Sequence, residues 1–309
     1  MIKIVKTLCA LGERQGLSAI AAANVITREL RDGGLSYVIE PIETFLPHAS
    51  SSLIVDGSRV DSAPTSLVGG VIDGKSSLVS SLIPSRYLID VPNINFNPQS
   101  KALSVSNFYF APALAIRAGD VSRVIQGKRV QGRVLVRKVR HMVPQILVGN
   151  LKNPSTIIFT HFDSIGPGAI DNASGTAVCL SLAVTYPEIL ANVLIVFDPN
   201  EEISYDYPTY WGHGYREFER RHLTLLRRAK RIISVDSVGN GVPTVFRDIN
   251  ILNLAFPIRN LKMLLPKTIT VGGDINKMME VYQSEADLPS LLSEKFLKQT
   301  RELVRSLLV

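Results

Sequence analysis

Three short apolar runs, each followed at once by polar side chains, constrain the fold of this 309-residue chain most strongly. The runs and their polar neighbours are, in chain order, 156–160 with His161 and Asp163, 193–197 with Glu201 and Glu202, and 232–235 with Asp236. Apolar runs of this length are typical of buried strands. In an open α/β sheet, ligands bind at the carboxyl ends of the strands. The sequence therefore predicts that these polar side chains gather at one edge of a sheet.

A further acidic side chain, Asp171, follows a Gly/Pro turn and precedes an apolar segment of helical character, 176–186. Taken alone, each candidate has an ordinary structural explanation, such as a hydrogen-bonded histidine or an aspartate at a helix N-terminus. Together they form a set of imidazole and carboxylate groups, which are the ligands used in two-metal hydrolysis. The order of the set along the chain favours a metal site.

The alternation of apolar strands with helical segments predicts an α/β fold with a mixed central sheet and helices on both faces. Two helices are expected before residue 35, then a strand over 37–45, and a last helix over 288–308. From about residue 53 to residue 140 the chain has short alternating runs separated by Gly, Pro and Asn, which is typical of strands and turns. We therefore predict an α/β domain formed by 1–49 and 142–309, with a β-rich insertion over 50–141.

The composition is that of a folded globular protein, with 46% hydrophobic and 20% charged residues. The formal net charge is +7, and arginines are concentrated between Tyr215 and Arg231. Apolar residues recur there at helical spacing, so we interpret the arginines, Arg216 included, as the exposed face of an amphipathic helix and expect no nucleic-acid partner. Cys9 and Cys179 are expected to be buried free thiols. Neither a signal peptide nor a membrane span is expected, which predicts a cytoplasmic location without a membrane partner. An oligomer is possible.

The ordered motifs resemble those of the co-catalytic zinc aminopeptidases, a superfamily that includes leucyl aminopeptidase, aminopeptidase Y, glutamate carboxypeptidase, glutaminyl cyclase and the transferrin-receptor ectodomain. The motifs that carry the resemblance are His161-Phe162-Asp163, Gly168 to Gly175, Glu201-Glu202, Asp236 to Gly239 and Tyr282 to Asp287. The resemblance implies a zinc-exopeptidase-like fold, with an insertion similar to a reduced protease-associated domain. It extends loosely to Gly12 to Gly16, where the family often has an Arg/Gly turn.

The resemblance also implies a role for each motif residue. His161 and Asp236 would bind one metal ion, and Glu202 would bind a second. Asp171 would bridge the two ions, and its bond to Asn172 is a candidate cis peptide. Asp163 would fix the imidazole tautomer of His161 from behind. Glu201 would be the general base that takes a proton from a metal-activated water. Zinc is the expected ion, in one or two copies, with cobalt or manganese as alternatives.

One position departs from the family pattern, because Gln283 stands where the family has a metal-binding histidine. An amide oxygen is a poor zinc ligand compared with an imidazole. Three outcomes are open: a single ion at His161, Asp171 and Asp236, rescue by another donor such as His213, or a protein of weak activity. His213 is expected to be a loop residue rather than a substitute ligand.

Two functions of different classes follow. The first is a metal-dependent exopeptidase, most specifically an aminopeptidase acting on a peptide or an amino-acid amide. The second is a catalytically weak or inactive binding or scaffold protein on the same fold, which Gln283 favours. Acyl transfer of the glutaminyl-cyclase type is a third possibility, but it requires the ligand that Gln283 replaces.

Overall fold

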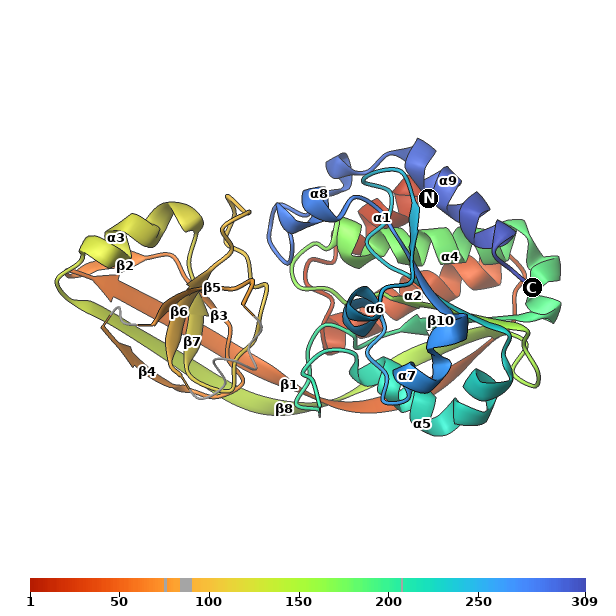
Figure 1. The fold of residues 1–309 in the computed structure, drawn as a ribbon, viewed down its shortest axis with the longest axis horizontal. Coiled ribbons are helices and arrows are strands. Elements are labelled where there is room, and N and C mark those ends of the chain that lie inside the picture. The colour runs from red at the N-terminus through yellow and green to blue at the C-terminus, as the bar shows by residue number, and fades with distance from the viewer. Residues whose placement is uncertain (75–76, 84–90, 207) are drawn as a thin grey trace. The chain divides into compact units, whose positions relative to one another are not determined.

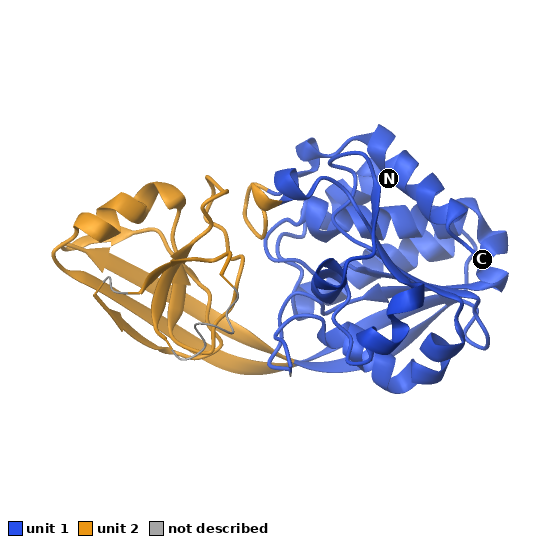
Figure 2. Ribbon diagram, viewed as in Figure 1, with its two compact units in different colours: residues 1–44, 141–278, 287–309 blue, residues 45–140, 279–286 orange. Residues whose placement is uncertain are grey.

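The computed structural model describes residues 1–74, 77–83, 91–206 and 208–309 (Figure 1). The chain divides into two compact units, and each is considered by itself (Figure 2). Unit 1 comprises residues 1–44, 141–278 and 287–309, and unit 2 comprises residues 45–140 and 279–286. No helix within the described ranges is both long and apolar enough to cross a membrane.

The helices and strands have the following bounds. The α-helices are α1 (Ile2–Cys9), α2 (Leu17–Asp32), α3 (Val121–Gln126), α4 (Ser174–Thr185), α5 (His213–Arg228), α6 (Ile249–Ala255), α7 (Leu261–Leu264), α8 (Ile275–Met279) and α9 (Glu294–Ser306). The strands are β1 (Tyr37–Val55), β2 (Ser58–Val60), β3 (Ala63–Pro64), β4 (Gly70–Asp73), β5 (Leu78–Ser80), β6 (Asn93–Phe96), β7 (Ala113–Ala115), β8 (Val130–Gly149), β9 (Thr156–His161), β10 (Val193–Asp198), β11 (Arg231–Val235), β12 (Thr244–Phe246) and β13 (Thr268–Gly272). Short 3₁₀ or irregular turns are η2 (Ala118–Asp120), η3 (Ala169–Ala173), η4 (Pro187–Ala191), η5 (Leu265–Lys267) and η6 (Pro289–Leu291).

The sheet of unit 1 has a parallel centre and antiparallel flanks. Strand β9 lies between β10 and β11 and is parallel to both, and β11 is parallel to β13. Strands β8 and β12 pair antiparallel with β10 and β13, respectively. The predicted mixed α/β sheet is confirmed. Because β9, β10 and β11 are parallel neighbours, their carboxyl ends lie at the same edge, as the polar residues after the three apolar runs required.

Helices cover both faces of this sheet, as predicted (Figure 1). Along β9, successive side chains point to opposite faces. Ile158 belongs to a core formed with α1, α2, α4 and α9. Ile157 and Phe159 belong to a second core, formed with α5, α6 and α7. All six residues of β9 are buried, which explains why the sequence run is continuously apolar rather than alternating.

Unit 2 is β-rich. Strands β3, β7, β6 and β5 form a small sheet in that order, and β2 and β4 pair with β1 and β8. Its core is made of aliphatic side chains of these strands together with Val124 of α3. Residues 118–126 form η2 and the short helix α3, which interrupt the strands. The likeness of this unit to a protease-associated domain stays a prediction.

The first strand is longer than the sequence predicted. β1 continues from residue 37 to residue 55, through Pro47 and the serine cluster that was expected to end it. Strand β2 pairs with β1 only over Leu53–Val55, so β1 is an edge strand at Pro47, where a missing N–H is tolerated. Strand β8 is likewise one continuous strand over residues 130–149.

Two further local predictions were wrong in detail. The last helix begins at Glu294 rather than at 288, because Leu292 and Ser293 have an extended backbone. Cys179 is buried as expected, but Cys9 is only half-buried, and both are free thiols.

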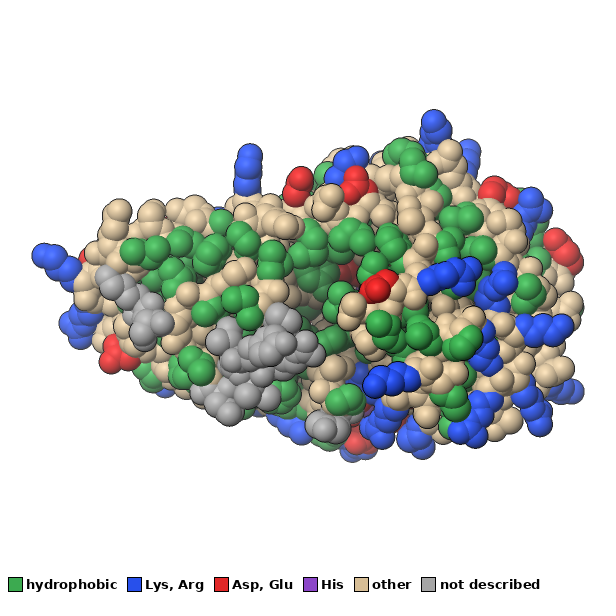
Figure 3. Space-filling model, in the orientation of Figure 1, with side chains coloured by type: hydrophobic (Ala, Val, Ile, Leu, Met, Phe, Trp, Pro, Cys, Tyr) green, Lys and Arg blue, Asp and Glu red, His purple; other side chains and the backbone are tan. Residues whose placement is uncertain are grey.

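Arg216 is also an exception to the predicted exposed face of α5. It is 4% exposed, whereas Phe218 and Leu225 are buried as expected. Its guanidinium donates hydrogen bonds to the side chain of Asp206 and to main-chain carbonyls of Trp211 and Pro257. The other arginines of α5 are exposed or half-buried, and Lys and Arg side chains are frequent on the surface over the part of unit 1 that holds α5 and α7 (Figure 3). The pattern of charges in the sequence does not by itself distinguish the buried Arg216 from the exposed arginines of the same helix.

Candidate metal centre

His161 is the last residue of β9, and its imidazole is 1% exposed. Its Nδ1 atom lies 3.3 Å from the main-chain oxygen of Asp163 and 3.3 Å from Oδ1 of the same residue. Because both neighbours are acceptors, Nδ1 carries the proton. With that proton on Nδ1, the other ring nitrogen, Nε2, would present its lone pair to a metal ion bound beside it.

Two carboxylates face this nitrogen. Nε2 of His161 lies 3.2 Å from Oδ1 of Asp171 and 3.6 Å from Oδ1 of Asp236, which directly follows β11. The same oxygen of Asp236 accepts a hydrogen bond of 3.0 Å from the hydroxyl of Ser237. The side chains at the carboxyl ends of β9 and β11, His161 and Asp236, thus lie close together.

Asp171 lies in η3, and its bond to Asn172 is cis, as the family resemblance implied. The backbone N–H groups of Ile170 and Asp171 donate to the carboxylate of Asp287, at 2.8 and 3.1 Å. Gly168 has a φ of 55°, and a Cβ atom there would lie 2.4 Å from the main-chain oxygen of Asp171. Only glycine fits this turn.

Asn172 connects η3 to the strands beneath it. Its Nδ2 donates to the carbonyl of Val235 at 3.0 Å and to the hydroxyl of Thr160 at 3.2 Å. Its Oδ1 accepts the N–H of Gly175 at 3.0 Å. A Cβ atom at Gly175 would lie 2.4 Å from that Oδ1, so glycine is required there. The polar residues around Asp171 therefore hold it in one place relative to β9 and β11.

Asp163 is fully buried and joins His161 to the two glutamates. Its Oδ1 accepts the backbone N–H of Glu201 at 3.0 Å, and its Oδ2 accepts that of Glu202, also at 3.0 Å. The segment after β10 is consequently held beside the imidazole through one carboxylate. The position assigned to Asp163 behind His161 agrees with this geometry, and its catalytic role stays a prediction.

The centre concentrates negative charge in a buried place. Asp171 is 8%, Glu201 7% and Glu202 2% exposed. Burial raises the pKa of Glu201 and of Glu202 well above the usual range, and the neighbouring carboxylates Asp163 and Asp171 act in the same direction. Buried carboxylates are costly unless a cation or hydrogen bonds compensate them. A divalent cation would supply that compensation.

The donors present fit a zinc ion. One ligand atom each of His161, Asp171 and Glu202 lies within 4.8 Å of the other two. Nε2 of His161 is buried and makes no hydrogen bond with the described residues, although two carboxylates are near it. An imidazole nitrogen with carboxylate oxygens is a usual ligand set of catalytic zinc. His161, Asp171, Glu202 and Asp236 would hold the ion.

Two predicted candidates remain, Gln283 and His213. Gln283 belongs to unit 2, where its main-chain oxygen accepts the N–H of Val105 at 2.9 Å. Its role as a ligand stays a prediction. His213 is the first residue of α5 rather than a loop residue, and its Nε2 donates to the main-chain oxygen of Glu43 at 2.8 Å. That hydrogen bond occupies one of its two possible ligand atoms.

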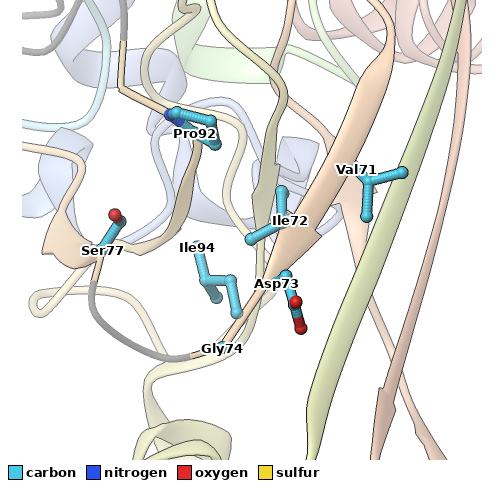
Figure 4. Close-up of a pocket in the computed structure, with 7 residues that line it drawn as sticks. All are labelled: Val71, Ile72, Asp73, Gly74, Ser77, Pro92 and Ile94. Atoms are coloured by element: carbon cyan, nitrogen blue, oxygen red, sulfur yellow. The ribbon is translucent and has the colours of Figure 1, made fainter.

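Unit 2 has a cavity of a different character (Figure 4). Among the described residues of its lining, Asp73 has the only charged side chain, so the lining lacks the donor set found in unit 1. The described lining residues are Val71, Ile72, Asp73, Gly74, Ser77, Pro92 and Ile94.

Several residues that hold the centre in place were not predicted as site residues. Asp287, Arg14 and Gln15 were noticed only as parts of motifs, and Asp198 and Gln145 were not singled out. Asp198 ends β10, and its carboxylate accepts hydrogen bonds from the N–H of Asn200 and from Nε2 of Gln145, both at 2.8 Å. In the sequence, Asp198 could have been recognised as a polar residue at the end of a buried strand.

The carboxyl group of Asp198 is expected to make the stability of the metal-free protein pH-dependent. Burial, followed by the nearby charge of Asp163, raises the pKa of Asp198 to about 7. An unfolded aspartate has a pKa of about 3.9. Between these values the native state binds more protons than the unfolded state, so the free energy of unfolding falls as the pH rises from about 4 to 7. The contribution lost is on the order of a few kcal/mol.

The change Asp198→Asn is expected to flatten this dependence. The measurement is the free energy of unfolding by urea at several pH values between 4 and 8, in the presence of a chelator. The quantity compared is the slope against pH, because the amide also alters the hydrogen bond to Gln145. Equal slopes for the wild type and the variant would contradict the assignment.

Comparison with known proteins agrees with this arrangement. Residues 145–249 match the model of peptidase family M28. This segment contains His161, Asp171, Glu201, Glu202 and Asp236. The predicted resemblance to the co-catalytic zinc aminopeptidases is confirmed. Comparison with curated protein sequences gives no match.

The solved structures similar to this chain have the same fold at low sequence identity. A zinc aminopeptidase from Bacillus subtilis is 14% identical, with a TM-score of 0.70, and the match covers 99% of this chain and 93% of that one. An aminopeptidase from Aneurinibacillus sp. strain AM-1 is also 14% identical, with a TM-score of 0.65 and coverages of 99% and 92%. A glutaminyl cyclase from Porphyromonas gingivalis is 13% identical, with a TM-score of 0.54 and coverages of 99% and 95%. The family match and these neighbours show a peptidase-like fold.

Proposed function

We propose that the protein is a zinc-dependent aminopeptidase that hydrolyses the first peptide bond of a peptide or the bond of an amino-acid amide. The observation that carries the proposal is the convergence of His161, Asp171 and Glu202 in one buried group, with the half-buried Asp236 3.6 Å from the same imidazole. A protein without catalytic function has no physical reason to bury so many carboxylates around one imidazole.

Each residue of the proposed centre has its own role in the reaction. A bound zinc ion would supply Lewis-acid chemistry, polarising the scissile carbonyl and lowering the pKa of water. Asp163 holds the proton of His161 on Nδ1 and so keeps Nε2 available. Glu201 takes a proton from the attacking water and delivers it to the leaving amine. The place of Glu201 is set by its backbone N–H, which donates to Asp163.

The proposal is tested by metal content and by activity in the same preparation. Zinc or cobalt per chain is determined by elemental analysis after loading and removal of free metal. Hydrolysis is measured with an aminoacyl p-nitroanilide, and its N-acetylated form serves as the matched control substrate. An aminopeptidase is expected to hydrolyse the first and not the second, because acetylation removes the free α-amino group.

The possible results separate the open alternatives. Two ions with activity would mean that some group takes the place of the histidine that Gln283 replaces. One ion with activity would mean a mononuclear enzyme. Metal-free protein that hydrolyses neither substrate would contradict the proposal and favour the binding or scaffold protein that Gln283 suggested.

A further inference from the structure

Arg14 lies in the turn between α1 and α2 and is fully buried. Its side chain donates to main-chain carbonyls on both ends of the loop 162–168. Nε donates to the oxygen of Phe162 at 2.7 Å, and Nη2 donates to that of Gly168 at 3.0 Å. Its Nη1 donates to the oxygen of Pro167 at 2.5 Å.

The backbone of Arg14 contacts the same loop, because its N–H donates to the oxygen of Ser164 at 3.2 Å. Phe162 directly follows His161, and Gly168 directly precedes η3, which contains Asp171. A guanidinium is planar, and its donors have fixed directions. Arg14 therefore sets the distance between the two ends of the loop that joins two candidate ligands.

Gln15 reaches the centre by a second route. Its Nε2 donates to Oδ2 of Asp163 at 3.1 Å, and that same oxygen accepts the N–H of Glu202. Its Oε1 is buried and makes no hydrogen bond among the described residues. The orientation of the amide is fixed by Asp163, because only the nitrogen can donate to a carboxylate.

The turn that holds both residues is itself constrained. Gly16 has a φ of 54°, and a Cβ atom there would lie 2.8 Å from Cε1 of His141. The main chain of the turn thus packs directly against a side chain of β8. Arg14 and Gln15 are presented to the loop from a backbone that is fixed in place.

We propose that Arg14 and Gln15 are positioning residues of the metal centre, with Arg14 fixing the loop between His161 and Asp171 and Gln15 fixing the carboxylate of Asp163. This inference rests on the proposed function, since it assumes that the centre binds a metal ion. Neither residue contacts the candidate ligands' coordinating atoms. Both act through Asp163 or through the main chain of the loop.

The principal test is Gln15→Met, which keeps the length of the side chain and removes its donor. Gln299→Met, at an exposed position of α9, is the matched control. Zinc affinity is measured by competition with a chromophoric chelator, and the visible absorption spectrum is recorded for cobalt-loaded protein. Asp163 is the partner behind the ligand His161, and loss of such a partner typically costs about 10- to 100-fold in affinity. Gln15 lies one step further out, so Gln15→Met is expected to weaken zinc binding by up to about 10-fold.

Two readouts separate positioning from a general loss of structure. The cobalt spectrum at saturating metal is expected to shift in Gln15→Met, while thermal unfolding of the metal-free variant stays close to that of the wild type. For hydrolysis, kcat is expected to fall with KM unchanged. Arg14→Lys keeps the positive charge, but an ammonium group cannot donate in the fixed directions of the planar guanidinium. This variant is expected to weaken zinc binding and to shift the cobalt spectrum, as Gln15→Met does.

The failures are distinguishable. If the wild type binds zinc and hydrolyses the aminoacyl substrate, and Gln15→Met and Arg14→Lys have its affinity, spectrum and kcat, the positioning proposal is wrong and the proposed function stands. If the wild type binds neither zinc nor cobalt, both the proposed function and the positioning proposal are overturned.

Discussion

The change Glu201→Gln is expected to abolish most of the hydrolytic activity and to leave the metal bound. General acid–base catalysis contributes about 10²- to 10⁴-fold, so kcat is expected to fall by about that factor. The amide has the shape of the carboxylate but cannot accept the proton of the attacking water. The bound metal is expected to remain, because the group formed by His161, Asp171 and Glu202 does not include Glu201.

The measurement combines kcat for the aminoacyl p-nitroanilide with the zinc content of each preparation. Glu188→Gln, at an exposed position of η4, is the control and is expected to match the wild type. The backbone N–H of Glu201 continues to donate to Asp163 in the variant, so the segment keeps its place. Hydrolysis at the wild-type rate in a zinc-loaded Glu201→Gln variant would rule out this residue as the base.

The sequence was informative where structure and chemistry are both local. The strands that carry His161, Glu201 and Asp236 were predicted almost to their ends, because β9, β10 and β11 are buried on both faces and read as continuous apolar runs. Their parallel pairing then follows from the helices between them. The convergence of His161, Asp171 and Glu202 follows from that topology.

The sequence was less informative about features that depend on contacts between residues distant in the chain. Arg14 reads as an ordinary charged residue, and its carbonyl partners lie more than 140 residues away in the chain. Pro47 reads as the end of a strand, but it is tolerated because β1 is an edge strand at that point. Whether a backbone N–H must form a hydrogen bond, and whether a charged side chain is buried, depends on neighbours that are distant in the sequence. No local sequence pattern specifies those neighbours.

The change Asp171→Asn is expected to have the largest effect on metal binding. It replaces the carboxylate whose Oδ1 faces Nε2 of His161 with a neutral amide. The backbone N–H of residue 171 keeps its hydrogen bond to Asp287, so the backbone of η3 is expected to keep its conformation. Loss of a ligand itself is expected to exceed the roughly 100-fold loss of affinity that removal of an outer partner causes. Zinc competition with a chelator measures the change, and Asp32→Asn, exposed at the end of α2, is the control.

The effect of the same variant on thermal stability is expected to depend on zinc. In a chelator, Asp171→Asn removes one of several buried carboxylates, and burial already raises the pKa of that carboxyl, so the midpoint of thermal unfolding is expected to stay unchanged or to rise. With zinc in 100-fold excess over its Kd, the wild type gains about 2.7 kcal/mol, and the variant gains much less at the same concentration. The midpoint of the variant should therefore be equal to or above that of the wild type in the chelator, and below it when zinc is added. A zinc-induced rise of equal size in both proteins would show that Asp171 is not a ligand. An overall loss of folding would lower the midpoint under both conditions, so a midpoint that is lower only with zinc indicates the loss of a metal ligand.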